Sequence, residues 1–412
     1  MLEKTLNGSK WYWRWIILLL ALMGVGFASY MLQLNQGLAV TGLSRDVSWG
    51  LYIAQLTFLV GVAASAVMVV LPYYLHNVKV FGRLTVFGEF LAVAAVIMCG
   101  LFVIVDIGKP ARLLNIMLYP SPNSILFWDM VVLNGYLLLN ILIGWNVLDA
   151  ERKSVAPPGW VKPLIYLSIP WAISIHTVTA FLYSGLPGKH YWLTAIMAAR
   201  FLASAFAAGP ALLILLCFLL RRVSKFDAGD EAIRRLSVIV TYAMAVTVFF
   251  VGLEFFTAFY SQVPGHMHAL EYLFVGYQGK GNLVPFMWTF AFLAVVALVL
   301  LLNPKTREKE NTLKIACAAV FISLWIEKGL GLVIAGYIPN AFEQVVEYVP
   351  TAPELMITIG IWATGAFVLT LLYKIAVSVK EESELSIYSA RYARVKPVGI
   401  TVSQDSGKTG GM

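Results

Sequence analysis

Ionisable side chains interrupt several of the long apolar segments of this 412-residue chain. His176 lies within one such segment, and the adjacent pair Glu327 and Lys328 lies within another. Further carboxylates occur in other segments or at their ends: Glu89, Asp106, Asp129 and Glu254. A charged side chain at the centre of a bilayer costs about 2.5–3.5 kcal/mol on insertion scales. These residues are therefore the first candidates for function.

The types of these residues suggest proton-coupled redox chemistry. A histidine flanked by carboxylates can donate and accept protons near neutral pH. Reduction of a quinone consumes electrons and protons together, and both carbonyl oxygens of the ring need donors. We therefore expect Asp106, Asp129 and His176 to converge as the catalytic groups of a quinone site. Aromatic residues should hold the ring and tail in an apolar wall, and four are placed to do so: Phe127, Trp128, Tyr136 and Tyr183.

Long apolar segments must position these residues. The chain is 60% hydrophobic and only 13% charged, with a mean hydropathy of +0.79, which excludes a soluble domain of this length. A membrane-spanning helix needs about 20 mostly apolar residues. Segments of this kind cover residues 15–34, 48–75, 84–106, 125–148, 161–186, 198–220, 237–262, 283–303, 312–336 and 353–378. We expect an all-α integral membrane protein with about ten transmembrane helices in a lipid bilayer.

The placement of basic residues predicts the orientation of these helices. Most of the 30 Lys and Arg residues fall on one face of the ten-helix topology, which the positive-inside rule assigns to the cytoplasm. Both termini then lie in the cytoplasm, in a bacterial inner membrane. The other basic residues, apart from the buried Lys328, are placed on the periplasmic face: Arg45, Lys109, Arg112, Lys189, Arg200 and Lys280. The net charge of +8 is thus a topology signal, and no nucleic-acid partner is expected.

An internal repeat indicates how the helices are grouped. The string FLVGVAASA at 58–66 resembles FLASAFAAG at 201–209, and His176 precedes Gly185 by the same spacing as Glu327 precedes Gly336. Units of four helices enter the membrane from the same side, which predicts a parallel repeat. The expected divisions are an N-terminal anchor helix in 1–47, a first four-helix bundle with the quinone site in 48–190, a second four-helix bundle in 191–340, a last transmembrane helix in 341–380 and a polar cytoplasmic tail in 381–412.

Depth along the helices separates the candidates into two groups. At 1.5 Å of rise per residue, Asp106, Asp129 and His176 reach the periplasmic half of the first bundle. Glu89 lies on the cytoplasmic side of them, and the other ionisable residues lie in the second bundle. We interpret these remaining four residues as a candidate proton relay: Glu89, Glu254, Glu327 and Lys328.

Each of these residues also has a plain structural interpretation. His176 can bridge two helices by a hydrogen bond, and Asp106 and Asp129 can cap helix ends. Glu327 and Lys328 can serve packing, although adjacent residues on a helix do not face each other, so each is expected to have its own partner. At the level of the whole chain, the alternatives are a secondary transporter of a small polar or anionic solute and a structural anchor for peripheral subunits.

The sequence offers no redox centre of its own. A haem that bridges two helices usually takes two axial histidines at membrane depth, whereas His176 is the one histidine well inside a segment. The three cysteines, Cys99, Cys217 and Cys317, lack metal-ligand spacing, and no phosphate-binding or dinucleotide motif occurs. We expect no haem, no iron–sulfur cluster and no metal site in this chain. If the chain handles electrons through a quinone, another subunit must supply or accept them.

Three stretches carry a resemblance to a known family. WGLYIAQLTFLVGVAAS at 49–65, DIGKPARLLNIMLYPSPNSILFWD at 106–129 and IHTVTAFLYSGLPGKHYWLTAIMAARFLASAFAAG at 175–209 resemble the NrfD/PsrC membrane subunits, the polysulfide reductase type. Ten segments make the chain most similar to the ten-helix members. These include subunits of alternative complex III and, above all, the integral membrane subunit of the quinone reductase complex of sulfate reducers.

The resemblance implies a quinone-site subunit of a multi-subunit menaquinone oxidoreductase, with menaquinone as a substrate-like cofactor. It implies a periplasmic four-cluster ferredoxin-like iron–sulfur partner, linked to molybdopterin-family or multihaem cytochrome c subunits. Asp106 and His176 match the family's quinone-site residues, with Asp129 beside them. The second bundle departs from the first, since Glu327 and Lys328 stand where its counterpart of His176 would be.

Overall fold

The computed structural model describes the backbone of residues 1–395 and the side chains of residues 1–383. Within this range the secondary structure is helical, apart from one isolated bridge between Tyr277 and Lys280. Of the predicted polar tail at 381–412, residues 381–395 continue the last helix, and residues 396–412 lie outside the described residues.

The described residues contain ten helices long and apolar enough to cross a membrane, as predicted. Seven are continuous: α1 (Lys10–Gln36), α4 (Thr85–Asp106), α6 (Ile125–Arg152), α7 (Val161–Ser184), α8 (Met197–Val223), α9 (Asp230–Tyr260) and α11 (Val284–Leu302). The second span is α2 (Leu51–Ala63) followed by α3 (Val67–Tyr74), and the ninth is α13 (Glu310–Leu324), the π-helix η6 (Trp325–Gly331) and α14 (Leu332–Ala335). The tenth lies in α15 (Ala352–Val395), and α5 (Asn115–Leu118), α10 (Pro264–Phe274) and α12 (Pro304–Arg307) are short connecting helices.

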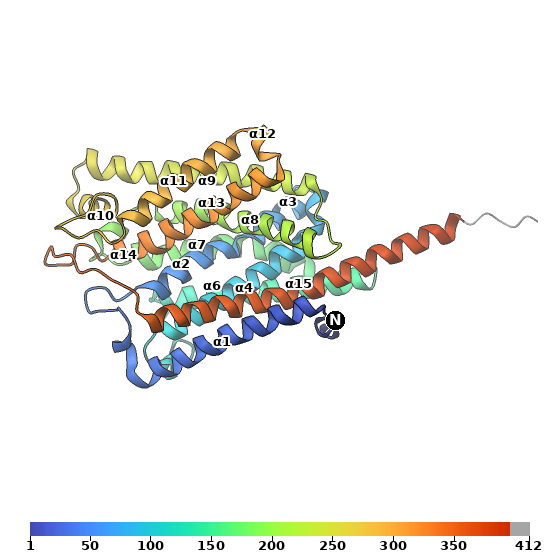
Figure 1. The fold of residues 1–412 in the computed structure, drawn as a ribbon, viewed down its shortest axis with the longest axis horizontal. Coiled ribbons are helices and arrows are strands. Elements are labelled where there is room, and N and C mark those ends of the chain that lie inside the picture. The colour runs from blue at the N-terminus through green and yellow to red at the C-terminus, as the bar shows by residue number, and fades with distance from the viewer. Residues whose placement is uncertain (396–412) are drawn as a thin grey trace, which may run out of the picture.

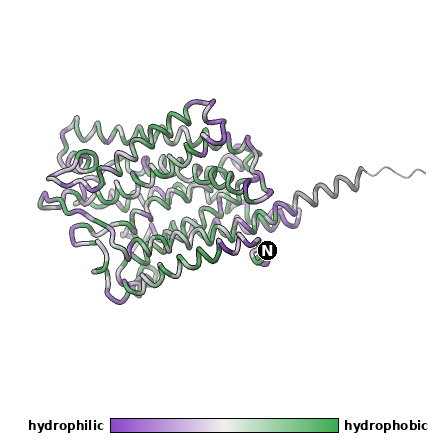
Figure 2. The backbone as a smooth tube through the Cα atoms, viewed as in Figure 1, coloured by the Kyte–Doolittle hydropathy of each residue, from purple (hydrophilic) through white to green (hydrophobic). Residues whose placement is uncertain are grey.

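These spans are helical because a helix satisfies its own backbone hydrogen bonds where no water is available. Apolar residues line the helices along their length, and polar residues gather at the two ends of the bundle (Figure 2). The chain begins at one end, and α15 extends beyond the bundle at that same end (Figure 1). We call this the terminus end and the opposite one the loop end. Helices α2, α6, α8, α11 and α15 begin at the loop end, and the other spans finish there.

Helix α2 forms the centre of the molecule. Its most apolar stretch is completely buried, and it packs against α4 and α7 on one side and α8, η6 and α14 on the other. Helices α2, α4, α6 and α7 form a first group. In a second group α8 packs against α9 and α13, and α11 packs against α9 and α13. The division into two repeated bundles stays a prediction.

Helices α1 and α15 pair at the edge of the first group, and α15 also packs against α4 and α6. A Cβ placed on Gly26 would lie 2.7 Å from the Cα of Gly360. The two backbones can approach this closely only because both residues are glycine.

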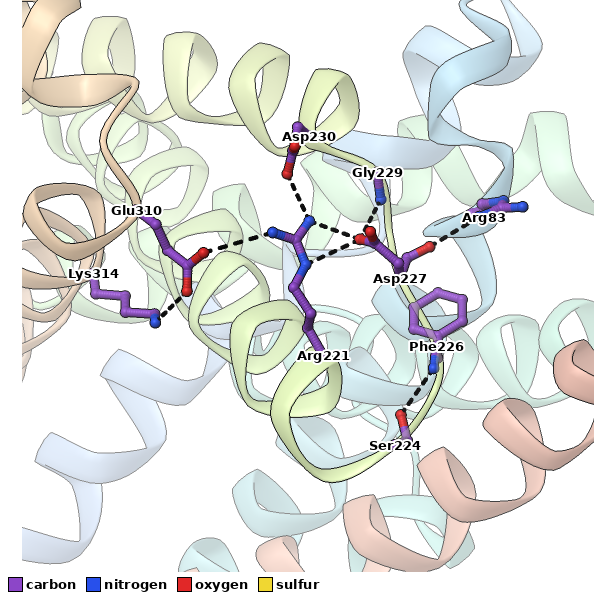
Figure 3. Close-up of polar contacts among 9 residues, drawn as sticks. All are labelled: Arg83, Arg221, Ser224, Phe226, Asp227, Gly229, Asp230, Glu310 and Lys314. Atoms are coloured by element: carbon purple, nitrogen blue, oxygen red, sulfur yellow. Dashed lines mark hydrogen bonds and ion pairs between the residues drawn. The ribbon is translucent and has the colours of Figure 1, made fainter.

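A charged network closes the terminus end (Figure 3). Arg221, at the end of α8, bonds Asp227 and Asp230 at 2.7 Å each and lies 3.7 Å from Glu310 of α13. Arg83 donates to the backbone carbonyl of Asp227 at 3.0 Å. The connector between α8 and α9 is thereby tied to α13 and to the segment before α4.

Candidate functional site

Buried polar side chains gather in the loop-end half of the bundle. They come from the loop-end halves of α2, α4, α6, α7, α8 and α9, which lie at a similar depth in the bundle. At 1.5 Å per residue, His176 lies about 12 Å from the end of α7. The fold therefore brings polar residues that are far apart in the sequence into the same half of the bundle.

His176 and Asp129 occupy neighbouring helices in the first group. Thr179, one turn after His176 on α7, donates to Oδ1 of Asp129 at 2.6 Å, which fixes that carboxylate. His176 is fully buried, with its ring edge-on to Phe206 at 6.4 Å between centroids. Neither ring nitrogen has a hydrogen-bond partner among the described side chains and backbone. The histidine therefore makes no hydrogen bond between helices within the described residues, and both ring nitrogens keep unused hydrogen-bonding capacity.

Asp106 is the last residue of α4, at the loop end. Its Oδ1 is buried and has no hydrogen-bond partner within the described range. Beside it, Gln33 donates to the carbonyl of Val105 at 2.6 Å and accepts from the hydroxyl of Tyr52 at 2.7 Å. Asp106 thus has unused capacity for hydrogen bonding next to a polar link between α1, α2 and α4.

An aromatic cluster covers the loop end of α7. Tyr183 is fully buried, and its hydroxyl shares a hydrogen bond with Thr57 of α2. Its ring lies edge-on to Trp49 at 5.5 Å and to Trp192 at 5.0 Å. Tyr337 packs against Trp192 at 5.2 Å. Sequence reasoning selected Tyr183 but missed Trp49, Trp192 and Tyr337, which lie outside the predicted spans or at their ends and are joined only by the fold.

The other predicted aromatic residues differ in position. Tyr136 is buried, and its hydroxyl donates to the carbonyl of Ala63 at 3.4 Å. Trp128 is 45% exposed and donates to the carbonyl of Pro122 at 2.8 Å. Phe127 is half-buried and packs against Trp128 at 5.4 Å. Trp128 therefore faces outward, and the structure does not bring it to the buried polar residues.

The second group holds a buried ion cluster centred on Arg200 of α8. Its guanidinium bonds Glu254 of α9 and Glu327 of η6, and all three side chains are buried. The prediction that Arg200 lies among the basic residues of the periplasmic face is wrong, since the side chain is buried inside the bundle and the residue is only 4% exposed. Its position inside the apolar run 198–220 was the available signal. Oε1 of Glu254 and Oε2 of Glu327 keep no partner in the described part of the chain.

Lys328 has a partner different from that of Glu327, as expected for adjacent helical residues. Its ammonium donates to the carbonyl of Phe201 at 3.2 Å and lies 4.3 Å from the centre of the Phe201 ring. It also lies 3.2 Å from the place that a Cβ on Gly61 of α2 would occupy. The cluster of Arg200, Glu254, Glu327 and Lys328 thus contains two basic and two acidic side chains and reaches the central helix α2.

Glu89 lies on the second turn of α4, near the terminus end of the first group of helices. The side chain is buried, and its Oε2 has no hydrogen-bond partner among the described residues. This oxygen lies 3.1 Å from where a Cβ on Gly144 of α6 would stand. Glu89 is therefore a buried carboxyl between α4 and α6, on the terminus side of His176.

The site is rich in proton-transfer groups and poor in metal ligands. No group of three or more His, Cys, Asp or Glu side chains in the described range is placed to hold a metal ion. Outside the spans, Lys189 lies 3.9 Å from the centre of the Tyr337 ring, and burial lowers the pKa of this lysine. The arrangement offers several buried side chains that can give or take a proton.

Comparison with known proteins gives a family and three relatives. Residues 39–341 match the family described as "Polysulphide reductase, NrfD". The chain is 25% identical to a putative membrane subunit of dimethyl sulfoxide reductase from Halobacterium salinarum, over 86% of this chain and 88% of the relative. It is 24% identical to a subunit of selenate reductase from Mesobacillus selenatarsenatis, over 86% and 91%. It is 25% identical to an Hdr-like menaquinol oxidoreductase integral membrane subunit of Archaeoglobus fulgidus, over 74% of each.

Proposed function

Because the chain belongs to the polysulphide reductase NrfD family, we propose that it is the quinone-binding membrane subunit of a respiratory oxidoreductase complex. The observation that carries the proposal is His176, fully buried with two free ring nitrogens in a multi-pass membrane protein. A relative at 25% identity is named a menaquinol oxidoreductase subunit, which supports menaquinone as the substrate.

The residues of the first group have distinct proposed roles. His176 binds a quinone carbonyl and holds or releases the proton at a ring nitrogen. Asp129, oriented by Thr179, is the carboxylate on the neighbouring helix, and Asp106 is the proton-exchanging carboxyl at the loop end. Tyr183 and Tyr136 form part of the wall around the ring. Bound quinone supplies the two-electron chemistry.

Electrons are proposed to pass between menaquinone and an iron–sulfur partner at the loop end. Relatives named as subunits of dimethyl sulfoxide and selenate reductases support a four-cluster ferredoxin-like partner, with molybdopterin-family or multihaem cytochrome c subunits beyond it. The proposed docking surfaces are 107–124 and 263–282. In the first of them the apolar side chains are exposed: Leu114, Met117, Leu118 and Tyr119.

The proposed orientation places the loop end in the periplasm of a bacterial inner membrane and both termini in the cytoplasm. Basic residues at the terminus end, such as Arg221, support it. Within the family, the chain is proposed to be a counterpart of the membrane subunit of the quinone reductase complex of sulfate reducers.

Protons are proposed to reach the site from the terminus end. Glu89 lies on that side of His176 with a free carboxyl oxygen. Glu254, Glu327 and Lys328 form the second part of the relay, with Arg200 holding the two carboxylates. Free oxygens on Glu254 and Glu327 support this role, because a relay needs groups that can still accept a proton. Turnover of reconstituted complex that builds no membrane potential would contradict the relay.

The quinone site is tested by His176→Leu and Asp106→Asn in the intact complex. Loss of a general acid–base group typically costs about 10²–10⁴-fold in rate, so quinone-linked turnover should fall by at least about 100-fold in His176→Leu. The matched control is Ser168→Ala, which removes a buried hydroxyl two turns earlier on α7 that bonds only its own helix. Turnover equal to that of the control in both variants would refute the assignment.

A further inference from the structure

A groove of about 340 Å³ lies on the outside of the bundle, away from His176 and the ion cluster. Four elements line it: α2, α13, η6 and α15. The residues at its mouth are Ile322, Leu355 and Ile359, which are 44–45% exposed on membrane-spanning helices. The groove therefore opens toward the lipid.

Gln55 of α2 lies at the base of this groove and is 1% exposed. Its Oε1 accepts hydrogen bonds from the indole nitrogens of Trp325 at 2.9 Å and Trp362 at 3.0 Å. Because an indole nitrogen can only donate, these two contacts fix which end of the amide is oxygen. The Nε2 group is then left buried, with no acceptor among the described residues.

Thr358 of α15 lines the same groove and is 9% exposed. Its hydroxyl is buried and has no hydrogen-bond partner in the described part of the chain. Two later threonines of α15 behave differently, since Thr364 donates to the carbonyl of Gly360 at 2.9 Å and Thr370 to that of Ala366 at 2.6 Å. The Thr358 hydroxyl thus keeps an unused hydrogen-bond donor.

Two unsatisfied donors in one apolar groove imply a ligand that brings an acceptor. A buried donor without an acceptor is unfavourable, and an incoming carbonyl oxygen would satisfy it. No charged side chain lines the groove, so a phosphate headgroup finds no counter-charge there. Its volume lies in the range of small-molecule sites, about 300–1,000 Å³.

We propose that this groove is a second quinone-binding site, separate from the site at His176. The ring lies beside the indoles of Trp325 and Trp362, and one carbonyl accepts hydrogen bonds from Nε2 of Gln55 and the hydroxyl of Thr358. The isoprenoid tail leaves past Ile359 into the lipid. The choice of a quinone as occupant rests on the function proposed above.

The π-helix η6 connects this groove to the interior. Trp325 begins η6 and bonds Gln55, whereas Glu327, two residues later, bonds Arg200. A π-helix is uncommon and occurs often at functional sites. The same short element thus shapes both the groove and the ion cluster.

The test is photolabelling with an azido-naphthoquinone that carries an isoprenoid tail. The intact complex is held in phosphatidylcholine nanodiscs, and labelled peptides are mapped with and without excess menaquinone. We expect label that menaquinone displaces in segments 321–325 and 355–362. Thr358→Val should reduce this label about threefold to tenfold, as loss of one hydrogen bond predicts, and Gln55→Leu should do the same or more.

Two further variants make the outcome decisive. Thr364→Val, on the same helix with its hydroxyl bonded to its own backbone, should leave the groove label unchanged. His176→Leu should remove label near α7 and leave the groove label in place. Groove label that survives Thr358→Val undiminished, or displaceable label near α7 alone, would overturn the second site. Displaceable label at neither place would overturn the proposed quinone function as well.

Discussion

Replacement of Arg200 by methionine is the sharpest test of the buried ion cluster. Arg200→Met keeps most of the side-chain volume but leaves the carboxylates of Glu254 and Glu327 without their shared cation. Breaking a buried ion pair by removing one partner costs about 3–5 kcal/mol. Because two carboxylates lose the same partner, we expect a loss in the free energy of unfolding at the upper end of this range.

The double variant Arg200→Met/Glu254→Gln separates charge from packing. In the single variant both Glu254 and Glu327 lose their cation, whereas in the double variant only Glu327 remains as a carboxylate without it. We therefore expect the double variant to be more stable than the single one, since it leaves one buried carboxylate unpaired and not two.

The assay is reversible unfolding in mixed micelles, read as a double-mutant cycle with Glu254→Gln as the other single variant. The control is Arg152→Met, whose pair with Asp149 is partly exposed and should matter by no more than about 1 kcal/mol. A loss below about 1 kcal/mol in Arg200→Met, or effects of the two changes that add within about 0.5 kcal/mol, would refute the geometry of the cluster.

Three further predictions follow from the site and the packing. Thr179→Val should lower quinone-linked turnover several-fold without loss of assembly, because Asp129 loses its orienting donor; Trp128→Phe, at the outer surface, should leave turnover unchanged. Gly26→Leu should weaken the contact of α1 with α15, measured as a lower thermal midpoint, and an unchanged midpoint would contradict the close approach. Leu118→Asp should reduce co-purification of the iron–sulfur partner, whereas full recovery would exclude 107–124 as the docking surface.

The spans could be predicted from the sequence because the bilayer imposes both their length and their apolar composition. The depth of each residue along its helix followed from counting residues from the helix end, and this depth correctly separated Glu89 from the residues at the loop end. Arg200 shows the limit of this reasoning. An arginine one turn from a helix end can reach water or turn inward, and only its partners on two other helices decide between these positions.

The sequence also does not reveal the direction in which a side chain points from its helix. Trp128 lies beside Asp129 in sequence but points to the outside, where it bonds Pro122. Gln55 could not be recognised as a site residue from the sequence, because it is an uncharged residue within an apolar run. Its partners Trp325 and Trp362 are 270 and 307 residues away along the chain. Pairings of this range depend on how the helices pack, which hydropathy does not encode.

The central claim is that a quinone binds at His176 inside the first group of helices. The most direct measurement is an experimental density map of the intact complex purified in the presence of menaquinone. We predict a quinone ring with one carbonyl oxygen about 2.6–3.2 Å from a ring nitrogen of His176, close to Asp129 and Tyr183. A map with quinone bound elsewhere, and with His176 enclosed by protein atoms alone, would contradict the account.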